Sequence, residues 1–175
     1  MTSLLYRQVA RGLVTHGEAA LLCEHQVPGL SVWACPGGAA EPGETLAEAL
    51  RRELHEEAGL QFGGERAEVM RITTEVPDLE PGGNRGVVTH WFLVSVDRRF
   101  SPVPGVPDTH EGHPIAEGIT SWRWWTAADV VDATGRGSAV FSPRDLGSLL
   151  PQLLAGTGEL PITRADSFSG YPGAT

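Results

Sequence analysis

One segment, residues 46–59, constrains this chain more than any other, because its apolar helical stripe ends in carboxylates. Thr45 is a favoured N-cap residue, and Glu48 three positions later completes the pattern of a capping box. We therefore expect a helix that begins at Leu46 and stops at Gly59. At about 100° per residue, one face of this helix starts with apolar residues and continues with acids, in the order Leu46, Ala49, Leu50, Glu53, Glu56 and Glu57.

Three physical effects oppose this acidic face. Like charges three or four residues apart repel, anions face the negative end of the helix dipole, and burial desolvates them. A divalent cation would reverse these costs by taking the carboxylates as ligands, so the pattern indicates a metal site. A solvated face with ion pairs from Arg52 to Glu48 and Glu56 is the simpler alternative. The side expected to face water carries Glu48, Arg51, Arg52 and His55.

A turn-rich loop leads into the helix. The runs Cys35-Pro36-Gly37-Gly38 and Glu41-Pro42-Gly43-Glu44 combine flexible glycines with fixed proline dihedrals, so backbone groups can approach a ligand closely. From Gly38 the chain continues with five residues, Glu44, seven residues and then Arg52-Glu53-Leu54-His55-Glu56-Glu57-Ala58-Gly59-Leu60. This pattern resembles an intact Nudix box, with every fixed position filled at the correct spacing.

The resemblance implies an α/β fold, the Nudix α/β/α sandwich with a mixed β-sheet. It also implies a hydrolase that uses Mg²⁺ or Mn²⁺ to cleave the diphosphate linkage of a nucleoside diphosphate derivative or nucleotide. ADP-ribose, nucleotide sugars and nucleoside triphosphates all stay open as small-molecule substrates. A noncatalytic Nudix module that binds or senses a nucleotide is the alternative, and the complete set of box carboxylates argues against it.

The same resemblance assigns roles to individual residues. The expected metal ligands are Glu53, Glu56, Glu57 and the backbone carbonyl of Gly38. Arg52 is expected to orient a carboxylate through its rigid fork, so the catalytic set is Arg52, Glu53, Glu56 and Glu57.

The box does not identify the general base that takes a proton from the attacking water. In some family members the base comes from a downstream loop, where Glu111 and Glu117 are the candidates in this chain. Neither residue lies in a diagnostic motif, and the sequence favours an ordinary exposed loop glutamate at each position. Glu44 is expected either to assist the metal site or to bond Arg52 and so pin the loop to the helix.

Substrate specificity is expected to reside in the long loops 77–85 and 101–118. Arg85 follows a glycine-rich turn and is a candidate for binding a substrate phosphate. Pro77 lies near a proline shared by some ADP-ribose hydrolases, although an ordinary turn explains it too. We expect core packing rather than base stacking for Trp33, Trp91, Trp122 and Trp124.

The rest of the chain is typical of a mixed α/β domain. Strands are predicted over residues 7–15, 19–25, 31–34, 67–76, 86–96 and 121–125. A helix opened by Ser142-Pro143 is expected to pack on the core through Leu146, Leu149, Leu150, Leu153 and Leu154, with Pro151 as a possible kink. We predict a single domain over residues 1–162, followed by a flexible tail over residues 163–175.

Net charge and composition limit the kinds of partner that we expect for this chain. The net charge is −9 and the chain contains no lysine, which argues against an extended nucleic-acid footprint. No apolar run could span a membrane, and Arg7 and Arg11 interrupt any signal peptide, so we expect a cytoplasmic protein without a membrane partner. A homodimer is left open. Cys23 and Cys35 are expected to be reduced structural thiols.

Overall fold

The computed structural model describes residues 6–79, 84–156 and 160–167, with the backbone alone at 76–79, 84–85 and 167. The strands in these residues are β1 (Tyr6–His16), β2 (Ala19–Val27), β3 (Leu30–Ala34), β4 (Gly37–Ala39), β5 (Glu68–Leu79), β6 (Asn84–Ser95), β7 (Ile119–Thr126), β8 (Phe141–Ser142) and β9 (Ile162–Ser167). The helices are α1 (Leu46–Ala58), α2 (Ala127–Gly135) and α3 (Leu146–Ala155).

Helix α1 forms where the sequence predicts it. The Glu48 backbone N–H donates to Thr45 Oγ1 over 3.2 Å, and the Thr45 N–H donates to Glu48 Oε2 over 2.8 Å, which closes the capping box. At the other end, Gly59 adopts a left-handed φ of 67° that an L side chain would resist. The predicted bounds of this helix are therefore confirmed.

Strand β1 is one of two branching strands, with β2, in a mixed, curled sheet with the order β8-β3-β2-β1-β6-β5-β9. It pairs in parallel with β6 and antiparallel with both β2 and β4, and the last pairing sets Arg11 opposite Gly37. Strand β7 joins the sheet through β2. The short strand β4 thus ties the loop before α1 to the middle of the sheet.

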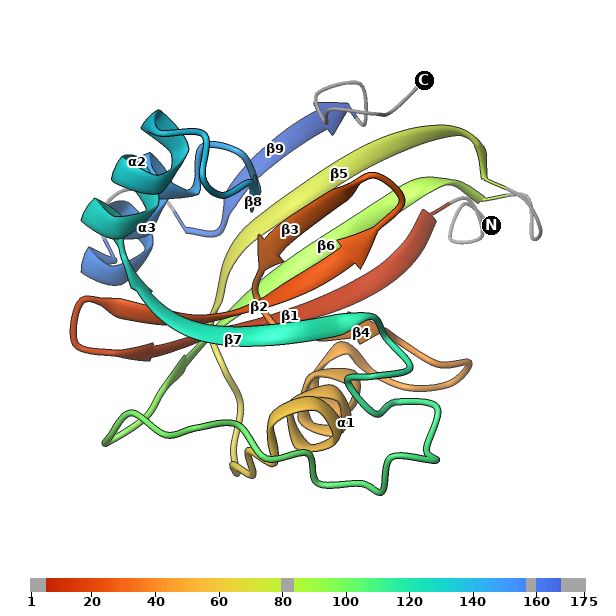
Figure 1. Cartoon of the computed structure of the whole chain (residues 1–175). Coiled ribbons are helices and arrows are strands. Elements are labelled where there is room, and N and C mark those ends of the chain that lie inside the picture. Colours follow the sequence, from red (N-terminus) through yellow and green to blue (C-terminus); the bar gives the residue numbers. More distant parts are fainter. Residues whose placement is uncertain (1–5, 80–83, 157–159, 168–175) are drawn as a thin grey trace.

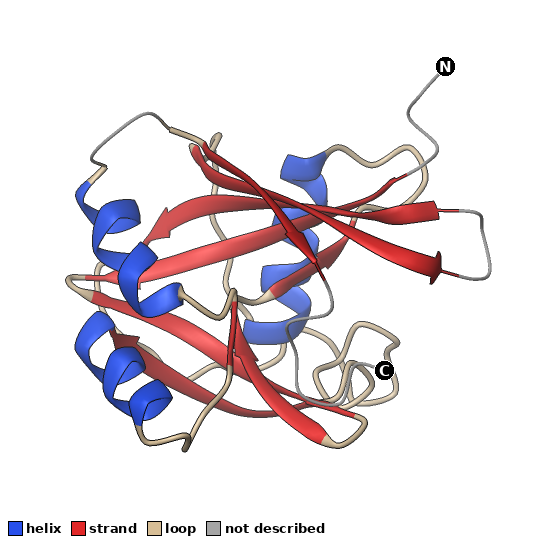
Figure 2. Ribbon diagram, turned by 90° about the horizontal axis from the view of Figure 1, so that it is seen from above, coloured by secondary structure: helices blue, strands red, loops and turns tan. Residues whose placement is uncertain are grey.

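Side chains alternate along β1, so the sheet buries one apolar cluster on each face. On one face, Ala10 and Val14 pack with Leu50 and Leu54 of α1. On the other, the cluster joins the sheet to α2 and α3 through residues that include Leu13, Leu22, Trp91, Trp125, Val130, Leu146 and Leu150. Figure 1 shows α1 below the strands and α2 and α3 on the opposite side. Seen from above in Figure 2, the strands cross in front of α1. The predicted α/β/α architecture is confirmed.

Several smaller predictions can also be compared with the structure. The four tryptophans pack in or against these two clusters, as expected, and both cysteines are buried and free. Helix α3 contains the predicted leucines and retains Pro151 inside it. Helix α2 was not predicted, although Thr126 and Asp129 form a second capping box at its start. No helix in the described ranges has both the length and the apolar character needed to cross a lipid bilayer.

Two predicted boundaries were wrong. Residues 163–167, assigned to a flexible tail, belong to β9 and pair in parallel with β5. Their polar sequence carries no strand signal, and the partner strand supplies the order instead. The predicted loop 77–85 is also shorter, because β5 extends to Leu79 and β6 starts at Asn84. Residues 168–175 of the predicted tail lie outside the described residues.

Candidate active site

The acidic face of α1 points toward the protein interior. Glu53, Glu56 and Glu57 are 8%, 7% and 1% exposed, which is unusual for carboxylates. The predicted alternative of a solvated acidic face is therefore wrong for these three residues. The structure gathers the three side chains on the helix face that packs toward β1 and β4.

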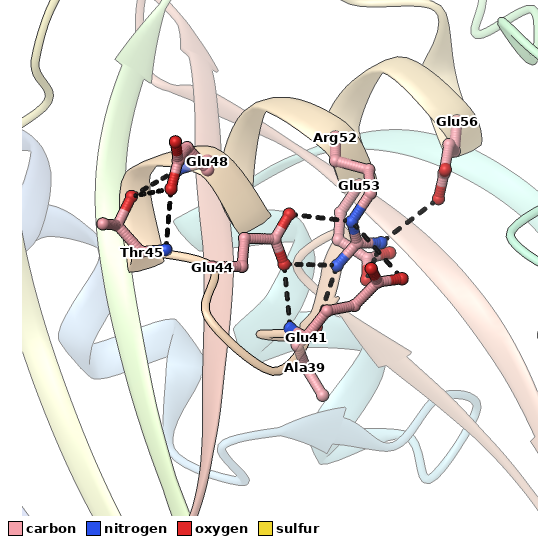
Figure 3. Close-up of polar contacts among 8 residues, drawn as sticks. All are labelled: Ala39, Glu41, Glu44, Thr45, Glu48, Arg52, Glu53 and Glu56. Carbon is pink, nitrogen blue, oxygen red and sulfur yellow. Dashed lines mark hydrogen bonds and ion pairs between the residues drawn. The ribbon is translucent and has the colours of Figure 1, made fainter.

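Arg52 is the cation at the centre of this group. Its Nε and Nη2 donate to the two oxygens of Glu44, both over 2.9 Å, in a fork-to-fork pair. Its Nη1 donates to Glu53 Oε1 over 2.8 Å and to Glu56 Oε2 over 3.3 Å, and Nη2 also reaches the carbonyl of Ala39. Figure 3 shows Arg52 between the loop and the helix. Arg52 thus compensates two glutamates of the helix and pins the loop to it.

The solvent-facing position predicted for Arg52 was therefore wrong. Its Nε and Nη2 find acceptors on Glu44 and Ala39 before the helix, which the helical wheel alone does not contain. Of the two roles expected for Glu44, the structure shows the bond to Arg52, and this hydrogen bond lowers the pKa of Glu44.

Glu57 is the most deeply buried acid of the group. Its Oε2 accepts the backbone N–H of Gly37 over 2.8 Å. Burial raises its pKa to about 8, the charge of Arg11 opposes that rise, and the charges of Glu53 and Glu117 add to it. Burial also raises the pKa of Glu53. The site therefore holds carboxyl groups that carry protons more readily than exposed glutamates do.

The glycines before the helix let the backbone approach these acids. Gly37 has a φ of 130°, and a Cβ added there would collide with the carbonyl oxygen of Ala10. A Cβ added to Gly38 would collide with the carboxylate of Glu53. Gly38 is thus placed beside a predicted metal ligand, and the close approach explains why glycine is needed at both positions.

The loop 101–118 covers the other side of the acidic face. Gly112 lies against Glu56 so closely that an added Cβ would collide with the carboxylate oxygen. Glu111 is its neighbour in the chain, and Glu117 lies close enough for its charge to raise the pKa of Glu53 and Glu57. The structure therefore brings the loop that carries both candidate bases to the acidic face.

This loop is anchored at the C-terminal end of α1. The Gly105 N–H donates to the carbonyl of His55 over 2.9 Å, and the Val103 N–H donates to the carbonyl of Ala58 over 3.3 Å. A Cβ on Gly105 would collide with the His55 ring. The prediction that His55 faces water was therefore wrong, because the loop packs over it.

Arg85 belongs to β6, but its side chain lies outside the described residues, as does that of Pro77. The proposed phosphate contact of Arg85 stays a prediction. Sequence reasoning missed Arg11, whose Nη1 donates to the carbonyls of Cys35 and Gly37 over 3.0 and 2.6 Å. Its one local signal is a charged residue inside the apolar stretch 9–14 of β1.

Comparison with known proteins agrees with this geometry. Residues 6–144 match the model of the NUDIX domain. The chain is 35% identical to an RNA pyrophosphohydrolase of Bradyrhizobium sp. (strain ORS 278) over 121 residues, which are 66% of this chain and 70% of that protein. It is 30% identical to an RNA pyrophosphohydrolase of Roseobacter denitrificans (strain ATCC 33942 / OCh 114) over 140 residues, 74% of this chain and 82% of that one.

The fold is also similar to solved structures. The ORF135 protein of E. coli superposes with a TM-score of 0.60 at 21% identity, covering 92% of this chain and 97% of that one. The box from Gly38 to Leu60, the fold around it and the matched residues lead to one conclusion: this chain belongs to the NUDIX family and is a Nudix hydrolase.

Proposed function

We propose that this chain uses Mg²⁺ or Mn²⁺ to hydrolyse the diphosphate linkage of a nucleoside diphosphate derivative or nucleotide. The observation that carries the proposal is the buried acidic face of α1, set against the glycine backbone of β4. Burying carboxylates that are only partly paired lowers the stability of the folded state. Such destabilising groups are typical of functional sites.

The donor set fits a hard divalent cation. In the described part of the chain, no three His, Cys, Asp or Glu side chains form a ready-made metal cage. Mg²⁺ does not require one, because it takes one or two carboxylates and completes its shell with waters and substrate phosphates. Glu53, Glu57 and the Gly38 carbonyl are the proposed ligands, with Glu56 beside them. When bound, the cation neutralises phosphate charge and so makes the phosphorus easier to attack.

The protein's own groups prepare this site. Arg52 holds Glu53 and Glu56 on one nitrogen, which fixes the direction of both carboxylates. The Gly37 N–H holds one oxygen of Glu57 and leaves the other available. Because burial raises the pKa of Glu57 to about 8, its carboxyl favours the protonated form near neutral pH, and a cation held there would require that proton to leave.

The identity of the base can be tested within the same site. Glu117 is our candidate from the loop, since its charge already acts on Glu53 and Glu57. Glu117→Gln is expected to lower kcat while keeping metal affinity, as a base should. A loss of metal affinity would instead make Glu117 a ligand.

The names of the relatives favour a second substrate class, RNA. The phosphoanhydride bonds of an RNA lie in the triphosphate at its 5′ end, so only the terminal nucleotide would need to enter the site. A chain with net charge −9 and no lysine is compatible with such an end-on contact, although not with a long basic groove. Our expectation of no extended nucleic-acid partner therefore does not exclude an RNA end.

The test is a substrate panel with Mg²⁺ that contains ADP-ribose, nucleotide sugars, dinucleoside polyphosphates, ordinary and oxidised nucleoside triphosphates, and a short RNA with a 5′-triphosphate. Products are resolved by chromatography beside the Glu57→Gln variant as the control. Cleavage by the wild type and not by the variant would support the proposal and identify the substrate class. Equal cleavage by the variant would refute the site, and ligand binding without cleavage would favour a noncatalytic module.

A further inference from the structure

Arg11 is a charged residue in β1, a strand near the middle of the sheet. It lies in β1 directly opposite Gly37 of β4. Its Nη1 donates to two carbonyls of the loop, those of Cys35 and Gly37, over 3.0 and 2.6 Å. One nitrogen of Arg11 therefore clamps the loop on both sides of Pro36.

Gly37 connects this clamp to the acidic face. Its carbonyl accepts from Arg11, and its N–H donates to Glu57 Oε2 over 2.8 Å. The residue has little freedom to shift, because it is paired with β1 and even an added methyl group would collide with the Ala10 carbonyl. The N–H that donates to Glu57 belongs to the Pro36–Gly37 peptide, whose own carbonyl accepts the Gly12 N–H over 2.8 Å. Arg11 holds the peptide groups on either side of it, so a shift of the chain at these two carbonyls would displace the donor to Glu57.

The charge of Arg11, like its hydrogen bonds, stabilises the carboxylate of Glu57. Among the described residues, no carboxylate lies within ion-pair distance of Arg11, whereas Arg52 is surrounded by them. The guanidinium is held by neutral carbonyls instead, and its charge acts favourably on the Glu57 carboxylate. Two arginines thus hold the acidic face. Arg52 forms direct ion pairs with Glu53 and Glu56. Arg11 acts on Glu57 indirectly, through the backbone at Gly37.

We infer that Arg11 is a positioning residue for the reaction, which holds the chain on both sides of the Pro36–Gly37 peptide and so positions the carboxylate of Glu57. This inference rests on the proposed function, because Glu57 is the group that is positioned. Residues that orient a metal ligand from behind are worth about 10- to 100-fold in metal affinity or activity.

The test compares Arg11→Met and Arg11→Lys with Arg7→Met. Arg7 lies four residues earlier on the same strand and is exposed, so its replacement removes the same charge without touching the clamp. The first measurement is hydrogen exchange of the Gly37 amide in the metal-free protein. We expect faster exchange in Arg11→Met, partial protection in Arg11→Lys, and wild-type protection in Arg7→Met.

The second measurement is Mn²⁺ affinity by electron paramagnetic resonance, together with kcat and KM on the best substrate. Arg11→Met is expected to lose about 10- to 100-fold in Mn²⁺ affinity or kcat, with KM for the nucleotide unchanged. Arg11→Lys, which keeps the charge, is expected to recover part of the loss and also provides the measurement if Arg11→Met does not fold.

Wild-type protection of Gly37 in the Arg11 variants would overturn the inference, as would loss of protection with unchanged Mn²⁺ affinity and kcat. A raised KM with unchanged protection would also overturn it, because Arg11 would then contact the substrate directly. Absence of hydrolysis by the wild type would refute the proposed activity alone, since the Gly37 amide and the Mn²⁺ affinity are measured without turnover.

Discussion

Helices α1 and α3 cover opposite faces of one sheet, yet they bury different side chains. Helix α3 buries leucines at positions 146, 149, 150 and 153, and Asp145 at its start makes no side-chain cap bond. Helix α1 buries Leu50 and Leu54, but also three glutamates, and it begins with a complete capping box.

The leucines of α3 contribute to stability, whereas the buried glutamates of α1 are there for the proposed chemistry. Each buried leucine contributes about 1.5–3 kcal/mol, so α3 can do without a cap. The acidic half of α1 opposes folding, and the cap, the Gly59 terminus and the Arg52 pairs offset that cost. We therefore expect substitutions on the two helices to affect different measurements.

The largest effect is expected at Glu57. Glu57→Gln should lower kcat by more than about 100-fold, because residues that merely orient a metal ligand are already worth about 10- to 100-fold. The melting temperature should not fall, since the neutral amide still accepts the Gly37 N–H and is less costly to bury. Steady-state kinetics and thermal melts check both statements, and normal turnover would refute the proposed site.

Leu150→Ala is the counterpart on α3. Leu150 is fully buried, so its truncation should lower the free energy of unfolding by about 2–5 kcal/mol. Urea unfolding measures the loss. At a temperature well below the transition, kcat should match the wild type. A large fall in kcat there would mean that the two faces of the sheet are coupled.

The pH dependence of stability should also distinguish the two faces. Burial raises the pKa of Glu57 from 4.5 to about 8. Between these values the folded state keeps a proton that the unfolded state has released, so the contribution of Glu57 to stability is fully present below pH 4.5 and is lost as pH rises toward 8. We expect this decline in chelator-treated wild type and a flatter profile in Glu57→Gln. Urea unfolding at several pH values measures it, and the Leu150→Ala variant should retain the wild-type slope.

The smallest effects are expected when two glycines, Gly112 and Gly135, are each replaced by alanine. In Gly112→Ala the new methyl group would displace the flexible end of Glu56, so kcat should fall several-fold while stability changes by less than about 1 kcal/mol. Gly135→Ala, at the end of α2, has open space around its Cβ and serves as the control. Equal kcat in both variants would show that the loop 101–118 does not constrain Glu56.

The predicted features were those with local signals. The capping box lies within four residues, and the change from apolar to acidic residues follows one helical face, so α1 and its glutamates could be located from the sequence. Two contacts of Arg52, those with Glu44 and Glu56, were also among the alternatives expected from the sequence, because these partners lie close to it in the chain. Arg11 could not be placed in this way, since its partners are carbonyls of a loop that only the folded chain brings near. Strand β9 was missed for the same reason, because its order depends on β5.

The parallel pairing of β1 with β6 has a consequence for the order in which the protein assembles. Tyr6 pairs with Gly86 and Thr15 with Ser95, so β1 can complete this pairing only after the much later strand β6 has been synthesised. Contacts that distant slow folding. The capped helix α1 can form on the nascent chain, but the loop 101–118 that covers its acids follows only after β6. The loop can therefore cover the acidic face only after β6 has been synthesised.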